Sequence, residues 1–232
     1  MIAQIPAQIY KSDSRGFLNS EKYNRFSTFN FEHYQELSRK AFGSLKVLNE
    51  VILAPQQRIT RFINSKTNVI LLPLFGGIEY KDNIGNVEFL HVEQIRVLAA
   101  DEELTFEIFN PYEKENVSYL EFEFQMEKQD FKNYFEQYKF DLSSHNKLHS
   151  LFEIERAHGF IGIYDGRKEG TFTLKNTDNG VFVFVINGAF EIENRLLEAK
   201  DGLAVQKTET IEWESLSQNA MLLVIEVPLN SN

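Results

Sequence analysis

Residues 61–86, RFINSKTNVILLPLFGGIEYKDNIGN, have the pattern of two consecutive strands from the middle of a small β-barrel. The apolar run over residues 69–75 is typical of a buried strand. Gly76 and Gly77 then predict a bend, and IEYKDNIGN at residues 78–86 predicts a second strand followed by a turn. This stretch therefore favours a barrel built from short antiparallel strands.

The composition sets the size and chemistry of the protein. The 232 residues allow one large β domain or two domains of about 110 residues each. Hydrophobic residues make up 43% of the chain, and the 21 phenylalanines favour strands and a β core. Because cysteine is absent, disulfides, thiolate ligands and a cysteine nucleophile are excluded.

The charge and the apolar runs bear on partners and location. A formal net charge of −10 argues against general nucleic-acid binding, since an acidic surface repels phosphate backbones. No apolar run approaches the roughly 18 residues that a membrane-spanning helix needs. We therefore expect a cytoplasmic protein without a nucleic-acid or membrane partner, and the sequence leaves its oligomeric state open.

Most of the chain carries strand patterns with period two. In YLEFEFQM, residues 119–126, alternation puts Glu121 and Glu123 on one face, which we expect to be solvent. Helical signals are few. Residues 31–42 fit a short helix, and residues 127–140 fit either a helix or a linker whose aromatic side chains pack against both halves.

A weak internal repeat indicates duplication. VILLPLFGGIEYKDN in the first half resembles GVFVFVINGAFEIEN in the second, and Gly77 and Gly188 are 111 residues apart. Each copy is an apolar strand, a glycine-bearing turn and a strand with acidic outward positions. The predicted fold is all-β, with two cupin-type barrels packed head to tail and a short linker or helix between them. The expected domains are residues 1–130 and, including the linker, 131–232.

Several segments together resemble one known family. They are SRGFLNSEKYNRFSTFNFEHY (residues 14–34), FGSLKVLNEVILAP (42–55), FGGIEYKDNIGN (75–86), FEIFNPY (106–112) and VFVFVINGAFEIENRLLEAKDGLAV (181–205). In order and spacing they are similar to the pirin-like bicupin family, which includes bacterial quercetinase-type proteins. The similarity covers most of the chain.

The resemblance implies a metal site in the first barrel. In that family an H-x-H step and an H-x-E step usually hold iron or another divalent metal. Counting back from Asn86 without a gap assigns the first step to Phe62 and Asn64. Anchoring on Asn110 and Pro111 assigns the second to Phe106 and Ile108. Phenylalanine and isoleucine cannot coordinate a metal and asparagine is a weak ligand, so we expect no metal and no cofactor.

The same four residues are the only candidate ligand pocket in the sequence. Phe62, Asn64, Phe106 and Ile108 are expected to face the interior of the first barrel. The simpler interpretation is that they fill its core. The alternative is a metal-free pocket for a small apolar ligand, with Asn64 orienting it. Arg58, Arg61 and Lys66 either add charge at its mouth or are solvated loop residues.

Other candidate sites have simple structural explanations. His145 and His149 have a spacing that can hold a metal on a helix, but they lie in a segment that enters a strand. Glu121 with Glu123, and Glu191 with Glu193, could perform acid–base chemistry if one member were buried. Solvent-facing positions explain both pairs, and we assign no catalytic residue.

The sequence therefore favours a protein that is metal-free, is not an enzyme, and binds a small apolar ligand or a protein partner. One alternative is a quercetinase-like dioxygenase with an unrecognised metal site, or an enzyme that works without a cofactor. The other is a regulatory or scaffold protein that acts through its surface.

Overall fold

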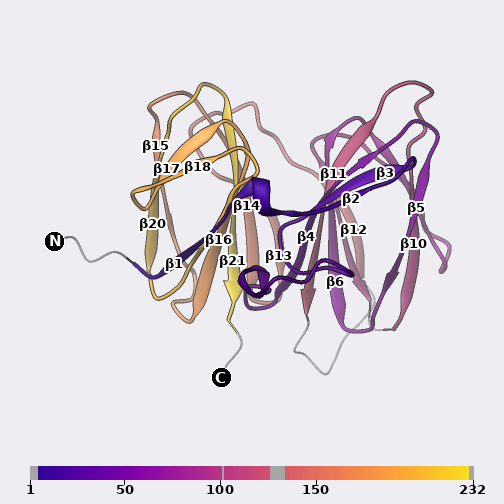
Figure 1. Cartoon of the computed structure of the whole chain (residues 1–232), viewed down its shortest axis with the longest axis horizontal. Coiled ribbons are helices and arrows are strands. Elements are labelled where there is room, and N and C mark those ends of the chain that lie inside the picture. The colour runs from indigo at the N-terminus through magenta and orange to yellow at the C-terminus, as the bar shows by residue number, and fades with distance from the viewer. Residues whose placement is uncertain (1–4, 101, 126–133, 230–232) are drawn as a thin grey trace. The chain divides into compact units, whose positions relative to one another are not determined.

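The computed structural model describes residues 5–100, 102–125 and 134–229 and forms two compact domains (Figure 1). The first domain comprises Gly16–Ala41 and Leu45–Phe140. The second comprises Met1–Arg15, Phe42–Ser44 and Asp141–Asn232. These bounds differ from the expected division in the N-terminal segment, in residues 42–44 and in residues 131–140. The segment before Phe140 pairs within the first domain, and the N-terminal segment pairs within the second.

The first domain is built from two antiparallel sheets. The larger has the strand order β12-β9-β6-β11-β4-β3-β2 and the smaller has the order β5-β10-β7-β8. The strands are β2 (Gly16–Asn19), β3 (Tyr23–Ser27), β4 (Leu45–Leu53), β5 (Arg58–Ile63), β6 (Thr67–Phe75), β7 (Ile78–Asp82), β8 (Val87–Leu90), β9 (Gln94–Ala100), β10 (Leu104–Phe109), β11 (Val117–Gln125) and β12 (Tyr134–Lys139).

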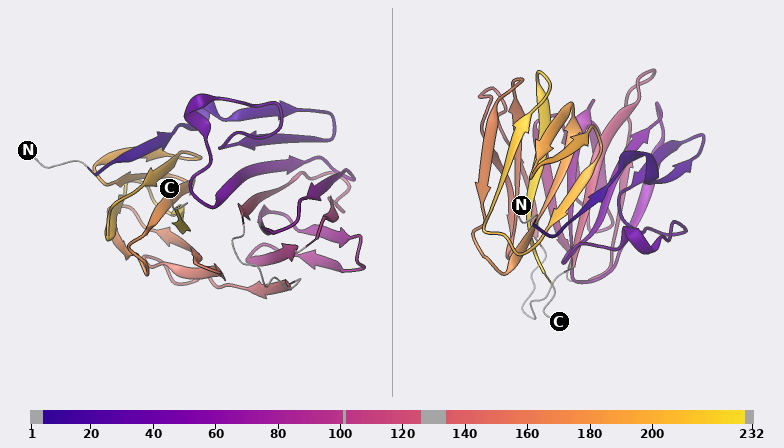
Figure 2. Two further views of the ribbon diagram at one scale, coloured as in Figure 1. Left: turned by 90° about the horizontal axis from the view of Figure 1, so that it is seen from below. Right: turned by 60° about the vertical axis from the view of Figure 1, so that its left-hand side comes forward.

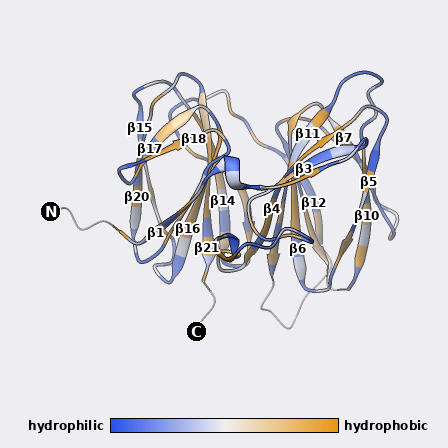
Figure 3. Cartoon of the chain, viewed as in Figure 1, coloured by the Kyte–Doolittle hydropathy of each residue, from blue (hydrophilic) through white to orange (hydrophobic). Residues whose placement is uncertain are grey.

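Alternation along the strands sends side chains from both sheets into one core. Val69 and Leu71 from β6 meet Tyr80 from β7 and Phe106 and Ile108 from β10 in a single cluster, and none of the five is more than 1% exposed. The strands enclose this cluster as the wall of a barrel, which is clearest in the left view of Figure 2. Figure 3 shows hydrophobic residues along the strands and hydrophilic ones at many turns.

The second domain has the same plan. Its sheets have the orders β1-β19-β16-β21-β14-β13 and β15-β20-β17-β18. The strands are β1 (Ala7–Tyr10), β13 (His149–Ile154), β14 (Ala157–Tyr164), β15 (Glu169–Thr173), β16 (Asn179–Asn187), β17 (Ala189–Ile192), β18 (Arg195–Glu198), β19 (Gly202–Val205), β20 (Thr210–Ser215) and β21 (Ala220–Pro228).

The two strand orders agree element by element, as the internal repeat predicts. The small sheet β5-β10-β7-β8 corresponds to β15-β20-β17-β18, and the run β9-β6-β11-β4 corresponds to β19-β16-β21-β14. The turn glycines that correspond are Gly76 and Gly188, both with positive φ (70° and 80°), a backbone conformation that other residues rarely adopt. The protein is thus all-β, with a duplicated cupin-type barrel.

The two helical expectations are wrong where the structure describes them. In residues 31–42 there is only a short 3-10 helix, η2 (Leu37–Arg39). The Asn30 side chain hydrogen-bonds both backbone groups of Glu36 (2.8 and 3.0 Å), which competes with helical bonding. Residues 127–133 lie outside the described residues. The remainder forms β12, because its backbone finds partners along β9.

Candidate ligand site in the first barrel

The register between β5 and β10 decides which candidate residues enter the first barrel. Phe106 pairs with Arg61, and Ile108 pairs with Ile59. Paired residues share a face of the sheet, and Phe106 and Ile108 are 1% and 0% exposed. Arg61 and Ile59 therefore point inward with them, and Arg61 is 9% exposed.

The other two candidates point away from the core. Phe62 follows Arg61 on β5, so its side chain lies on the outer face and is 76% exposed. Asn64 lies just beyond the end of β5 and is also exposed. The expectation that all four candidates face the interior therefore holds for Phe106 and Ile108 only. Counting back from Asn86 without a gap therefore assigned the first metal-ligand step to Phe62, which is one position away from the inward-facing Arg61.

The inward set can be tested against the metal that the family resemblance implies. Around the two positions that the resemblance assigns on β10, it consists of Phe106 and Ile108 with their register partners Arg61 and Ile59. Three of these side chains are hydrocarbon, and a guanidinium is a permanent cation with no lone pair to donate. These residues do not fit a divalent metal, whose protein ligands are imidazole, carboxylate or thiolate.

Arg61 is held by two carboxylates. Its Nε donates to Glu121 Oε1 at 2.7 Å, and an Nη donates to Glu123 Oε1 at 2.6 Å. The expectation that Glu121 and Glu123 face solvent is wrong, since Glu121 is fully buried and the Glu123 side chain is only 16% exposed. Both faces of β11 are covered by other parts of the protein. The alternation correctly placed Glu121 and Glu123 on one face of the strand, but it did not show that this face is buried.

Burial and the neighbouring charges shift the pKa values of both Glu123 and Arg61. Burial and the neighbouring Glu121 charge raise the pKa of Glu123 to about 7, although Arg61 opposes the change. Burial alone would lower the pKa of Arg61, but the charges of Glu121 and Glu123 outweigh it and raise that pKa. Two largely buried carboxyl groups around one guanidinium make this cluster chemically distinct from the apolar core around it.

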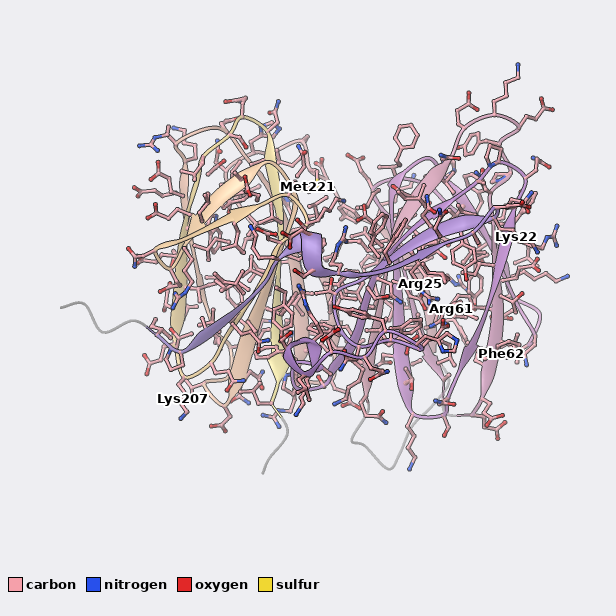
Figure 4. All side chains as sticks on the ribbon, viewed as in Figure 1. Lys22, Arg25, Arg61, Phe62, Lys207 and Met221 are labelled. Carbon is pink, nitrogen blue, oxygen red and sulfur yellow. The ribbon has the colours of Figure 1, made fainter. Side chains whose placement is uncertain are left out.

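A second arginine and an aromatic ring adjoin this cluster. The guanidinium carbons of Arg25 and Arg61 lie 4.4 and 4.9 Å from the centroid of the Phe31 ring, which places Phe31 against both cations. Arg25 is buried and forms a two-point ion pair with Glu32. Figure 4 labels Arg25, Arg61 and the outward-facing Phe62.

The remaining candidates are engaged in local hydrogen bonds. His145 Nδ1 lies 3.1 Å from Asp165 Oδ1, and His149 Nε2 lies 2.8 Å from the Ser144 carbonyl oxygen. Glu191 is exposed, and Glu193 accepts a backbone hydrogen bond. Across residues 5–100, 102–125 and 134–229, no three His, Asp or Glu side chains are grouped as a metal site. The same ranges contain no helix long and apolar enough to cross a membrane.

Sequence reasoning missed the importance of Arg61 and the burial of Glu121. The signal for the first was present, because Arg61 alternates with Ile59 and Ile63 along an apolar strand face. The signal for the second was absent, because period-two alternation looks the same whether the polar face meets water or a buried cation.

Comparison with known proteins places this architecture in a class. Residues 143–227 match the family model described as the quercetinase C-terminal cupin domain. The chain is 20% identical over 222 residues to quercetin 2,3-dioxygenase of Escherichia coli K12, covering 92% of this chain and 95% of the relative. It is 21% identical over 209 residues to a putative quercetin 2,3-dioxygenase of Pasteurella multocida, covering 85% and 89%.

Solved structures agree on the fold. YhhW from E. coli superposes with a TM-score of 0.89 at 18% identity, covering 98% of this chain and all of the other. The structure described as bacterial pirin YhhW in complex with nickel(II) gives a TM-score of 0.88 at 17% identity, covering 97% and 100%. Each domain consists of two sheets whose strand orders correspond between the domains. Together with these similarities, this architecture defines a two-domain cupin protein. Within that class, the chain is similar to pirin-like proteins along most of its length, and its C-terminal domain matches the quercetinase cupin model.

Proposed function

We propose that this pirin-like cupin protein acts by binding and does not carry out quercetinase-type oxygen chemistry in its first barrel. The observation that supports the proposal is the inward set Ile59, Arg61, Phe106 and Ile108, which offers no metal ligand. Oxygen activation of the quercetinase type needs a metal centre to handle electrons. A fold shared with quercetin dioxygenases does not by itself transfer their activity.

In this proposal Arg61 supplies the positive charge inside the barrel. Its guanidinium donates to two carboxylates at 2.7 and 2.6 Å, so both carboxylates already have a cationic partner within the protein. Phe106 packs 5.5 Å from Tyr80, centroid to centroid, within the core. This packing weighs against an apolar ligand enclosed by the four candidate residues and favours a ligand or partner that binds elsewhere on the protein.

The proposal is tested by oxygen uptake. Wild-type protein is incubated with Fe(II), Ni(II) or Mn(II), desalted, and mixed with quercetin in an oxygen electrode. The E. coli quercetin 2,3-dioxygenase is treated identically as the positive control. We expect no quercetin-dependent uptake above that of heat-denatured protein, whichever metal is used. Saturable uptake that follows the added metal would contradict the proposal.

A further inference from the structure

Arg96, a further buried arginine of the first domain, has no counter-charge among the described residues. Arg96 on β9 is 3% exposed, and its Nε has no hydrogen-bond partner among the described residues. Its guanidinium carbon lies 4.2 Å from the centroid of the Tyr80 ring. Within the described ranges no carboxylate forms an ion pair with it. Buried charges are normally paired, so this one calls for a partner.

The nearest acidic network is already used by neutral donors. Asp82 accepts the Tyr80 hydroxyl at 2.8 Å and the Asn86 amide at 2.7 Å on one oxygen. On the other it accepts the backbone N–H groups of Asn86 and Ile84, at 2.8 and 3.2 Å. This carboxylate therefore holds the β7–β8 turn, and the contact described for the Arg96 guanidinium is with the Tyr80 side chain.

Arg96 lies on the wall of a groove of about 490 Å³, at the edge where β12 and β8 end the two sheets. Gln137 is its register partner on β12, and Lys139 and Phe135 are the neighbours of Gln137 on the same face. Glu88 on β8 also lines the groove. The groove thus combines two cations, one carboxylate, three amides and aromatic side chains. Its volume is in the range of small-molecule sites.

The amide of Gln137 has a defined orientation. Its Nε2 donates to the Phe89 carbonyl oxygen at 3.0 Å, which leaves Oε1 as an acceptor. That Oε1 is buried and has no donor among the described residues. A ligand that satisfies the groove would bring a negative charge to Arg96 and a hydrogen-bond donor to Gln137.

We propose that this groove binds a small organic anion, specifically a monocarboxylate that carries a hydroxyl group. We expect the ligand to carry a single negative charge, because Glu88 in the groove and the net charge of −10 disfavour the binding of polyanions. The planar guanidinium of Arg96 suits a carboxylate, and Phe135 provides an apolar surface for the carbon skeleton. This inference deepens the proposed binding function and rests on it. It uses none of the four positions at which the family resemblance implies a metal.

The test is isothermal titration calorimetry with four probes: lactate, 2-hydroxybenzoate, benzoate and inorganic phosphate. We expect saturable one-to-one binding of at least one hydroxycarboxylate, with benzoate and phosphate weaker. Arg96→Gln should weaken binding at least tenfold. Arg58→Gln removes an exposed arginine of the same domain and should change it less than twofold.

Two variants at the groove keep the test decisive if Arg96→Gln does not fold. Glu88→Gln removes the exposed carboxylate and should tighten binding about threefold or more, which general destabilisation would not produce. Gln137→Leu should abolish the preference for 2-hydroxybenzoate over benzoate. The inference is overturned if no probe binds below about 10 mM, or if Glu88→Gln and Gln137→Leu leave the affinities unchanged. If no probe binds and no quercetin-dependent oxygen uptake is observed, this inference is wrong but the proposed function is retained.

Discussion

Arg61 illustrates how a single residue changes the chemistry of a barrel interior. Its guanidinium is buried on β5, and it is tolerated there because Glu121 and Glu123 accept its hydrogen bonds at 2.7 and 2.6 Å. Such an arrangement adds little net stability over an apolar one, because each ion loses its hydration. Its consequence is that a permanent cation occupies part of the barrel interior.

Removing Arg61 should therefore destabilise the first domain. Arg61→Met leaves Glu121 and Glu123 buried without a counter-charge, and we expect a loss of about 3–5 kcal/mol in the free energy of unfolding. Urea unfolding followed by circular dichroism measures it. The single tryptophan, Trp213, lies in the second domain, so its fluorescence should show that domain unaffected.

Two further variants separate charge from packing. Arg58→Met breaks an exposed ion pair with Glu107 and should cost less than about 1 kcal/mol. The triple variant Arg61→Met, Glu121→Gln and Glu123→Gln removes the uncompensated charges and should recover most of the loss. Equal effects of the Arg61 and Arg58 substitutions would show that the buried cluster carries no charge coupling.

The same residues show which features of the candidate site could be predicted from the sequence and which could not. Phe106 and Ile108 are buried as expected, because the Asn110 anchor directly follows their own strand. Counting back to Phe62 and Asn64 crosses the turn between β5 and β6, where Lys66 has a φ of 58°. Turn length is not determined by strand periodicity, so the phase of β5 could not be deduced from β6.

Among the elements, the edge strands were the hardest to foresee. β1 completes the large sheet of the second domain by pairing with β19, and β12 completes that of the first by pairing with β9. The two edge strands hold the same place in the two sheet orders. The partners of β1 lie about 190 residues away, as the bond from Lys11 to Asp201 shows. Local sequence carries no information about such a pairing.

The attachment of β1 should contribute measurably to the second domain. Tyr10 is 3% exposed and packs edge-on against Phe182, with ring centroids 5.5 Å apart. We expect Tyr10→Ala to lower the free energy of unfolding by about 3 kcal/mol, because it leaves a cavity in the core.

Trp213 fluorescence during urea unfolding reports this change, since Trp213 belongs to the core of the same domain. Ile9 is the adjacent residue of β1 and is 42% exposed, so Ile9→Ala is the matched control and should cost about 1 kcal/mol or less. If Tyr10→Ala is no more destabilising than Ile9→Ala, then β1 does not contribute to the core as its burial indicates.

For the molecule as a whole, the fold was predictable and the chemistry was only partly so. Period-two alternation and the internal repeat are properties of many residues, so one error did not change the predicted duplicated barrel. The candidate site depends on the phase of one strand and on the environment of Glu121. The fold therefore follows from the pattern, whereas the site required the register between β5 and β10.

The proposed function depends on an inward set in the first barrel that cannot hold a metal. Two designed variants provide the controls. Ile59→His, Arg61→His, Phe106→His and Ile108→Glu together place the family's ligand types on the inward face. Phe62→His and Asn64→His, combined with the same two β10 changes, place the first histidine pair on the outer side of the chain.

The most direct measurement is the metal content of tag-free wild-type protein after growth with added iron, zinc, nickel and manganese, determined by elemental mass spectrometry. We predict less than about 0.1 metal per chain for the wild type and for the outward variant, and close to one for the inward variant if it folds. A stoichiometric metal in the wild-type protein would contradict the account and would restore the dioxygenase hypothesis.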